Sequence, residues 1–289
     1  MGKASRRKQH PDHDRAARPA AYTARPFAGL AGETDWVALK EILPAATAPV
    51  RLATPKDDDG EVTIATVLPM AWAGLRRADG VIFAATQGGN GSGDASRDLA
   101  AGILAALAAE PGAPVTQLPL ATDATPRLQD LIDVTQAPDV TVHAGFDFWV
   151  EGQELDEAAR ASLDQANGAT VPTTKMSAAP SAYWCLLGGR SHLRLVLPDD
   201  EDNATDALAR LAAAGTSSLG DGTRLLGAFR ACGLLIPVWE LVGDTPANDY
   251  EEALTSFTSR YAAALTDAPL TSAERRARAG LLSRQVTLR

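Results

Sequence analysis

Apolar and polar positions along the chain follow two rhythms, one typical of strands and one typical of helices. Short alternating or continuous apolar runs predict strands over residues 50–53, 61–68, 81–86, 140–150, 182–187, 192–197 and 234–241. Apolar residues at helical spacing predict helices over residues 35–43, 70–77, 94–109, 127–134, 155–166, 204–214, 223–231 and 249–265. The glycine pair at 188–189 favours a hairpin between two of the strands. Together these elements predict an α+β fold.

Two segments suggest an internal duplication. Residues 74–83 align with residues 227–236, because each carries Arg-Ala-x-Gly followed by an apolar run and each follows a predicted strand that ends in Leu-Pro. We expect Gly80 and Gly233 to end helices in the left-handed conformation. Joints of this kind also recur in unrelated folds, so one mixed-sheet domain is the alternative to two similar, partly antiparallel halves covered by helices.

The chain divides into a basic arm, two α+β halves and a basic C-terminal helix. The expected bounds are 1–26, 27–168, 169–270 and 271–289. The arm lacks apolar periodicity and is predicted to be disordered. Thr271 and Glu274 have the spacing of a capping box, which predicts the start of the last helix.

Charge is spread unevenly around a net charge of −9. Residues 1–25 contain seven basic and two acidic side chains, and residues 272–289 contain five arginines and one glutamate. The segment between them therefore carries a net charge of −18. Such a body repels nucleic acid and anionic membranes at long range, whereas the basic ends can reach a phosphate-rich or acidic partner. The alternative is that the ends only offset the field of the body and aid solubility.

Composition excludes several classes of protein. A length of 289 residues with 45% apolar and 22% charged residues is typical of a folded globular chain. No window approaches the roughly 18 unbroken apolar residues of a membrane helix. Cys185 and Cys232 lie in apolar settings, which favours buried and inert thiols. The N-terminus has no apolar signal segment, so we expect a cytoplasmic protein.

The glycine-rich segment at residues 88–93 (GGNGSG) is the strongest candidate for a phosphate loop, since it lies between a predicted strand and a helix. It lacks the third glycine of the dinucleotide-binding motif and the lysine of the Walker motif. Asp94 and Asp98 at the start of the helix would also repel a phosphate. We therefore expect a surface loop and no cofactor.

Two acidic runs could hold a divalent cation in principle. Residues 57–60 fail the EF-hand pattern, and residues 199–202 precede a helix, where carboxylates act as caps. No group of cysteines and histidines has zinc-ligand spacing. The sequence predicts no metal site.

Reactive side chains do not form a recognisable catalytic group. His143 and His192 lie on predicted strands and are expected to be hydrogen-bonded structural residues. A nucleophile pair of Cys185 with His143, or of Cys232 with His192, has no supporting pattern. No catalytic residue is predicted.

Trp149, Tyr183 and Trp184 adjoin predicted strands. Aromatic residues in such positions usually pack in a core or an interface. A ligand pocket lined by these three residues is the alternative.

Several segments resemble an uncharacterised family of actinobacterial proteins, a domain of unknown function. They are MGKASRRKQ, ARPFAGLAGETDWVALKEILPAATAPV, HLRLVLPDDEDNATDALARLAAAG, GTRLLGAFRACGLLIPVWEL and TSAERRARAGLLSRQVTLR. The resemblance covers nearly the whole chain and implies an intracellular actinobacterial protein, without catalytic residues. Members are sometimes labelled by association with the Sec preprotein translocase ATPase, but this chain has neither its Walker lysine loop nor its C-x-C zinc tail.

The sequence favours a cytoplasmic binding or adaptor protein without catalytic activity. Its basic ends would engage an anionic partner such as RNA, the ribosome or an acidic protein, and the expected contacts include Arg275, Arg276 and Arg278. The alternative is an enzyme of unknown class with its site near residues 88–93 or near Trp149 and Tyr183. A structural homo-oligomer is a third hypothesis.

Overall fold

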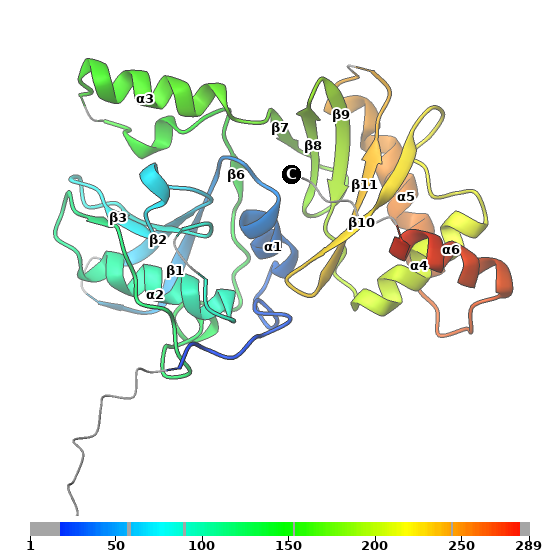
Figure 1. Ribbon diagram of the computed structural model, residues 1–289, viewed down its shortest axis with the longest axis horizontal. Helices are drawn as coiled ribbons and strands as arrows, with labels where there is room; N and C mark the ends of the chain where they lie inside the picture. The colour runs from blue at the N-terminus through cyan, green and yellow to red at the C-terminus, as the bar shows by residue number, and fades with distance from the viewer. Residues whose placement is uncertain (1–17, 57–58, 89–90, 153, 244, 284–289) are drawn as a thin grey trace, which may run out of the picture.

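The computed structural model describes residues 18–56, 59–88, 91–152, 154–243 and 245–283, and it has two β-sheets with helices (Figure 1). The first sheet has the strand order β5-β3-β4-β2-β1-β6, and the second has the order β10-β11-β9-β8-β7. Both sheets combine with α-helices, so the predicted α+β class is confirmed.

The strands of the first sheet are β1 (Ala46–Lys56), β2 (Asp59–Ala65), β3 (Gly74–Arg76), β4 (Ile82–Ala85), β5 (Pro114–Val115) and β6 (Thr141–Val142). Those of the second are β7 (Thr173–Lys175), β8 (Ala182–Leu187), β9 (Arg190–Leu195), β10 (Arg224–Ala231) and β11 (Leu234–Glu240). The α-helices are α1 (Glu33–Glu41), α2 (Ala95–Ala108), α3 (Glu157–Gly168), α4 (Glu201–Ala213), α5 (Glu251–Ala264) and α6 (Ser272–Ser283). Short 3-10 turns occupy η1 (Pro69–Ala71), η2 (Leu128–Asp130), η3 (Asp147–Trp149) and η4 (Ala247–Tyr250).

Helix α1 lies between the two sheets (Figure 1). Its Trp36 is fully buried and stacks on Phe27 at a centroid distance of 6.1 Å. The apolar cluster around it includes Ile64 of the first sheet and Ile236 of the second. Because this cluster takes residues from both sheets, the two predicted halves share one hydrophobic core.

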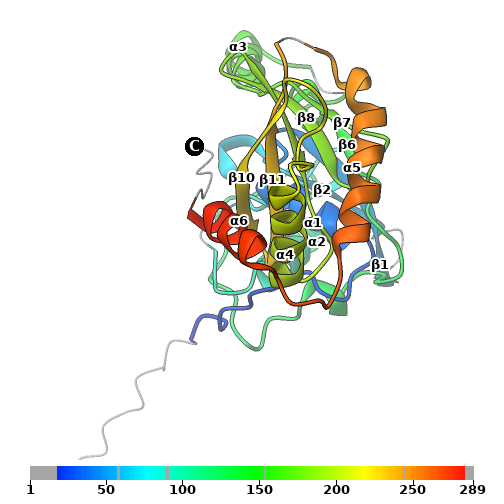
Figure 2. The same cartoon turned by 90° about the vertical axis from the view of Figure 1, so that its right-hand side faces the viewer.

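A second core lies on the other face of the second sheet, beneath α4 and α5 (Figure 2). Trp239 of β11 packs edge-on against Phe257 of α5, with ring centroids 4.8 Å apart. Leu208 of α4 belongs to the same buried cluster. The described helices are not long and apolar enough for a membrane span.

Two segments predicted to be helices are strands. Within residues 70–77 the structure has η1 and then β3, and residues 223–231 contain β10. Each strand pairs with the following strand as an antiparallel hairpin. Gly74 and Gly227 weaken a helix, and exposed and buried positions alternate over the first half of β10, which suits a strand.

The aligned segments therefore have the same form, but that form is a hairpin rather than a helix followed by a strand. Gly80 and Gly233 adopt positive φ in the two turns, at 93° and 76°. The strand order β3-β4-β2-β1 matches β10-β11-β9-β8. The strand directions differ, because β2 and β4 are parallel whereas β9 and β11 are antiparallel. The internal duplication stays a prediction.

Other predicted elements are shorter than expected. Only Thr141–Val142 is a strand within residues 140–150, and η2 is a single turn within residues 127–134. Beyond β6 the chain turns toward α3, where a Cβ at Gly145 would lie 2.4 Å from the side-chain oxygen of Asn167. Glycine at position 145 therefore permits this close approach.

The proline in β11 does not make it an edge strand. β11 lies between β10 and β9, and its pairing with β9 begins at Val238, directly after Pro237. The register shift predicted as the other possibility is present, between Leu225 and Gly227 of β10.

Residues 18–26 form a segment, here called the N-terminal strap, that packs on the folded body. The amide of Ala20 donates to the carbonyl of Ala121 at 2.7 Å, and Arg25 pairs with Glu33 at 2.6 Å and donates to the carbonyl of Pro198. The prediction of disorder up to residue 26 is therefore wrong for the strap. Residues 1–17 of the predicted arm lie outside the described residues.

Candidate partner-binding surface around the C-terminal helix

Helix α6 begins with the predicted capping box. The amide of Thr271 donates to the Glu274 carboxylate at 2.6 Å, and the amide of Glu274 donates to the Thr271 hydroxyl at 3.3 Å. The hydrogen bonds from the Thr271 backbone and hydroxyl lower the pKa of Glu274. Because these contacts lie within α6 and its cap, the start of the helix does not depend on the rest of the protein.

Arg278 attaches α6 to α4. Its guanidinium lies 2.6 Å from the carboxylates of both Asp202 and Asp206, which are one helical turn apart on α4. Figure 2 shows α6 lying across α4. The expectation that Arg278 faces a partner is therefore wrong for this conformation, because its charge is already paired.

Arg275 and Arg276 are exposed. The guanidinium of Arg275 bonds the carbonyl of Leu270 and the hydroxyl of Ser272, both just before or at the start of α6. None of the residues of α6 is buried. Two of the three predicted arginine contacts thus lie on an open helix face.

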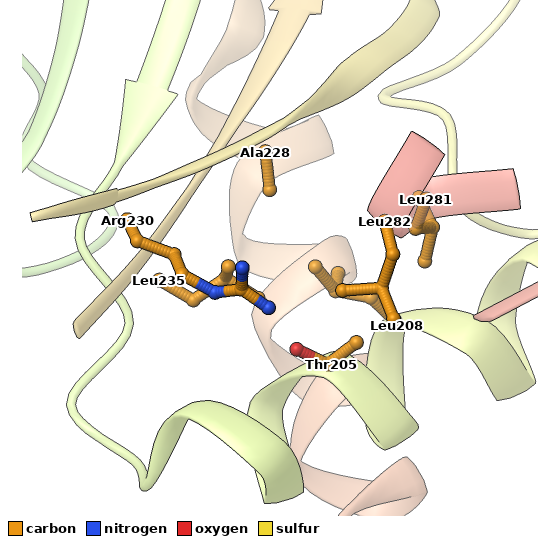
Figure 3. A pocket seen from close by; sticks show the side chains of 7 residues that line it. All are labelled: Thr205, Leu208, Ala228, Arg230, Leu235, Leu281 and Leu282. Carbon is orange, nitrogen blue, oxygen red and sulfur yellow. The ribbon is translucent and has the colours of Figure 1, made fainter. Parts of the chain in front are cut away.

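A small hollow separates α6 from the body (Figure 3). Leu281 and Leu282 of α6 face Thr205 and Leu208 of α4 across it, and Leu235 and Arg230 come from the sheet. Arg230 is paired with Glu201, so its charge is also satisfied. The hollow measures about 20 Å³, which is room for about one water molecule. It is a packing gap rather than a ligand pocket.

The aromatic pocket predicted from Trp149, Tyr183 and Trp184 is not formed. Trp149 stacks on Phe146 at 4.4 Å and donates to the carbonyl of Val67. Tyr183 is 1% exposed in the shared core, whereas Trp184 packs on the second core. Neighbouring strand residues point to opposite faces, so Tyr183 and Trp184 cannot line one cavity. Burial and the nearby Asp35 carboxylate raise the pKa of the Tyr183 phenol.

The glycine-rich loop at 88–93 leads into α2, whose first turn is capped by the chain itself. The Asp94 carboxylate accepts from the amide of Ser96 at 3.0 Å and from the hydroxyl of Thr23 in the strap at 3.0 Å. Arg97 and Arg127 lie within 3.6 Å of the same carboxylate. The side chain of Asp94 therefore occupies the position at which a phosphate would bind. Gly89 and Asn90 lie outside the described residues.

The thiols and imidazoles pair differently from either predicted arrangement. Cys185 of β8 lies opposite His192 of β9 in the sheet register. Burial raises the pKa of Cys185 and lowers the pKa of His192, which keeps the thiol protonated and the ring neutral. Burial also raises the pKa of Cys232 to about 12. Neither thiol has the lowered pKa of a nucleophile.

His143 accepts or donates a hydrogen bond at 2.7 Å with the hydroxyl of Thr47, in keeping with a structural role. The run at residues 199–202 acts as a helix cap, because the Asp200 carboxylate accepts from the amides of Asp202 and Asn203. Among the described residues no group of side chains is arranged to hold a metal ion.

Sequence reasoning missed the partners of the last helix. Asp202 belonged to a run interpreted only as a cap, and Asp206 was not singled out. The spacing of four residues between the two aspartates was the available signal, since it places both carboxylates on one face of α4.

It also missed two wider apolar hollows. One of about 540 Å³ lies at the seam between α1 and α5, and one of about 510 Å³ lies between β1 and α2. At the seam, Tyr261 donates to Asp199 at 2.8 Å. The walls of both hollows come from segments far apart in the chain, so no local pattern announced them.

Comparison with known protein families gives one match. The profile of a family of unknown function (DUF5926) matches residues 26–289. The chain belongs to this family. The match confirms the predicted resemblance to an uncharacterised family. No curated protein and no solved structure matches the chain.

Proposed function

We propose that the protein is a binding protein without catalytic activity whose arginine-rich C-terminal helix engages an anionic macromolecule. The observation that carries the proposal is the exposure of Arg275 and Arg276 on a helix that caps itself and buries no residue of its own. A helix with so small a part in the core is available for a partner.

The chemistry of these side chains favours a phosphate-bearing partner, and we take RNA, free or in a ribosome, as that partner. All basic residues after position 271 are arginines. The planar guanidinium group binds phosphate in a bidentate way that lysine cannot reproduce. The acidic body opposes RNA at long range, so contact would be confined to the basic helix.

The proposed compartment is the cytoplasm. The support is that Cys185 and Cys232 are both free thiols, as is usual in a reducing environment. RNA and ribosomes are present in the same compartment. An adaptor role, in which the body binds a second molecule, would use the seam hollow or the hollow beside α2.

The test is the affinity of the full chain for a labelled single-stranded RNA as a function of salt. We expect Arg275→Gln/Arg276→Gln to weaken binding and to reduce the slope of log affinity against log salt by about 1.4, or about 0.7 for each phosphate that is no longer neutralised. A matched control is Arg190→Gln/Arg224→Gln, since these arginines are 72% and 70% exposed and pair with Glu240 on the second sheet.

Equal weakening in the two double variants would contradict the proposal, because only overall charge would then matter. Binding of an acidic polypeptide in place of RNA would overturn the choice of a phosphate-bearing partner.

A further inference from the structure

The charge of Arg278 is shared between two possible uses, and this inference rests on the proposed function. In the structure its guanidinium pairs with Asp202 and Asp206. The same side chain lies on the helix that carries Arg275 and Arg276, two to three residues away. A phosphate bound by α6 would compete with the two aspartates for Arg278.

The attachment of α6 is weak enough to be reversible. The side chain of Arg278 is 29% exposed, and those of Asp202 and Asp206 are 81% and 32% exposed, so water and salt screen both ion pairs. The apolar part of the contact rests on Leu281 and Leu282, which are only partly buried, and the hollow beside them leaves the packing incomplete.

The helix can also leave without unfolding. Its capping box belongs to the helix itself, and residues 266–271, which connect it to α5, are exposed or half-buried. Arg210 of α4 holds the connection through the carbonyls of Ala264 and Ala268, which fixes one end of the movement near α5.

We infer that α6 is a latch: Asp202 and Asp206 of α4 hold it on the body through Arg278, and RNA phosphate displaces them. The two states are mutually exclusive at Arg278. Docking of α6 on α4 therefore weakens RNA binding, and RNA binding promotes release of α6 to the same extent, since coupling between two equilibria is reciprocal.

The experiment combines RNA affinity at low salt with amide hydrogen exchange of residues 272–283 in the full chain. Asp202→Asn/Asp206→Asn removes both acidic partners while keeping the size of the side chains. We expect faster exchange in α6 and RNA binding about two- to tenfold tighter than in the control. The control is Asp221→Asn/Glu252→Gln, which removes the same charge from exposed positions elsewhere on the second half.

A third variant separates the two roles of the arginine. Arg278→Gln frees the helix but removes a phosphate contact, so exchange in α6 should rise as in Asp202→Asn/Asp206→Asn without the gain in affinity. Tight RNA binding by Arg278→Gln equal to that of the aspartate variant would overturn the inference.

The outcomes distinguish the latch from the proposed function. If wild type and variants all bind RNA, but the aspartate variant matches its control in affinity or in α6 exchange, the latch is wrong and the proposed function stands. If no form binds RNA, the proposed function fails, and its regulation with it.

Discussion

Gly91 and Gly93 lie two residues apart before α2, yet their surroundings differ. A Cβ at Gly93 would lie 2.6 Å from the backbone nitrogen of Tyr22 and 2.7 Å from the carbonyl oxygen of Ala20. A Cβ at Gly91 would meet only the side chain of Asp98, at 3.4 Å. Glycine at position 93 therefore lets the N-terminal strap approach the loop.

We predict that Gly93→Ala destabilises the protein by about 1–3 kcal/mol, because the strap backbone has to move to admit a methyl group. Gly91→Ala should stay within about 0.5 kcal/mol of wild type. Denaturant unfolding of the two variants measures the difference. Equal stabilities would show that the strap does not pack on this loop.

At the scale of elements, α6 illustrates how a cap responds to pH. Hydrogen bonding lowers the pKa of Glu274 in the folded helix. A carboxyl group with a lowered pKa stabilises the fold above its ordinary pKa, and that contribution disappears as the pH falls through the folded value.

We therefore predict that hydrogen exchange in the first turn of α6 accelerates, beyond its intrinsic pH dependence, between about pH 6 and pH 3. Glu274→Gln should remove most of this acceleration, since an amide does not titrate in that range. The same acceleration in Glu274→Gln would assign it to other groups, such as the carboxylates that hold Arg278.

Local signals predicted the elements whose ends carry specific chemistry. The glycines at 188–189 marked the β8–β9 hairpin, and Thr271 with Glu274 marked the start of α6. The strands β3 and β10 were misassigned because short apolar segments fit both helical and strand periods. Only their pairing with β4 and β11, which is set by tertiary structure, decides between the two.

The candidate site was predictable only in part for the same reason. Exposure of Arg275 and Arg276 follows from the polar face of a terminal helix. The pairing of Arg278 with Asp202 and Asp206 joins residues far apart in the chain, the separation being 76 positions for Asp202, so no local pattern contains it. The aromatic pocket failed because strand alternation, not sequence proximity, decides which side chains share a face.

At the scale of the whole molecule, one hydrophobic core joins two sheets and leaves the ends of the chain to other tasks. Trp36 on α1 and Tyr183 on β8 belong to the same buried cluster, so the halves support each other. The acidic charge lies in the segment 26–271, and the basic helix lies at its edge on α4. This separation of charge is what makes a localised contact with RNA physically reasonable.

The most direct test of this account is ultraviolet cross-linking of the full-length protein to RNA, followed by mass spectrometry of the linked peptides at low and high salt. The account predicts cross-links that are concentrated in peptides from residues 272–283 and that disappear at high salt. Cross-links spread over the acidic body, or unaffected by Arg275→Gln/Arg276→Gln, would contradict it.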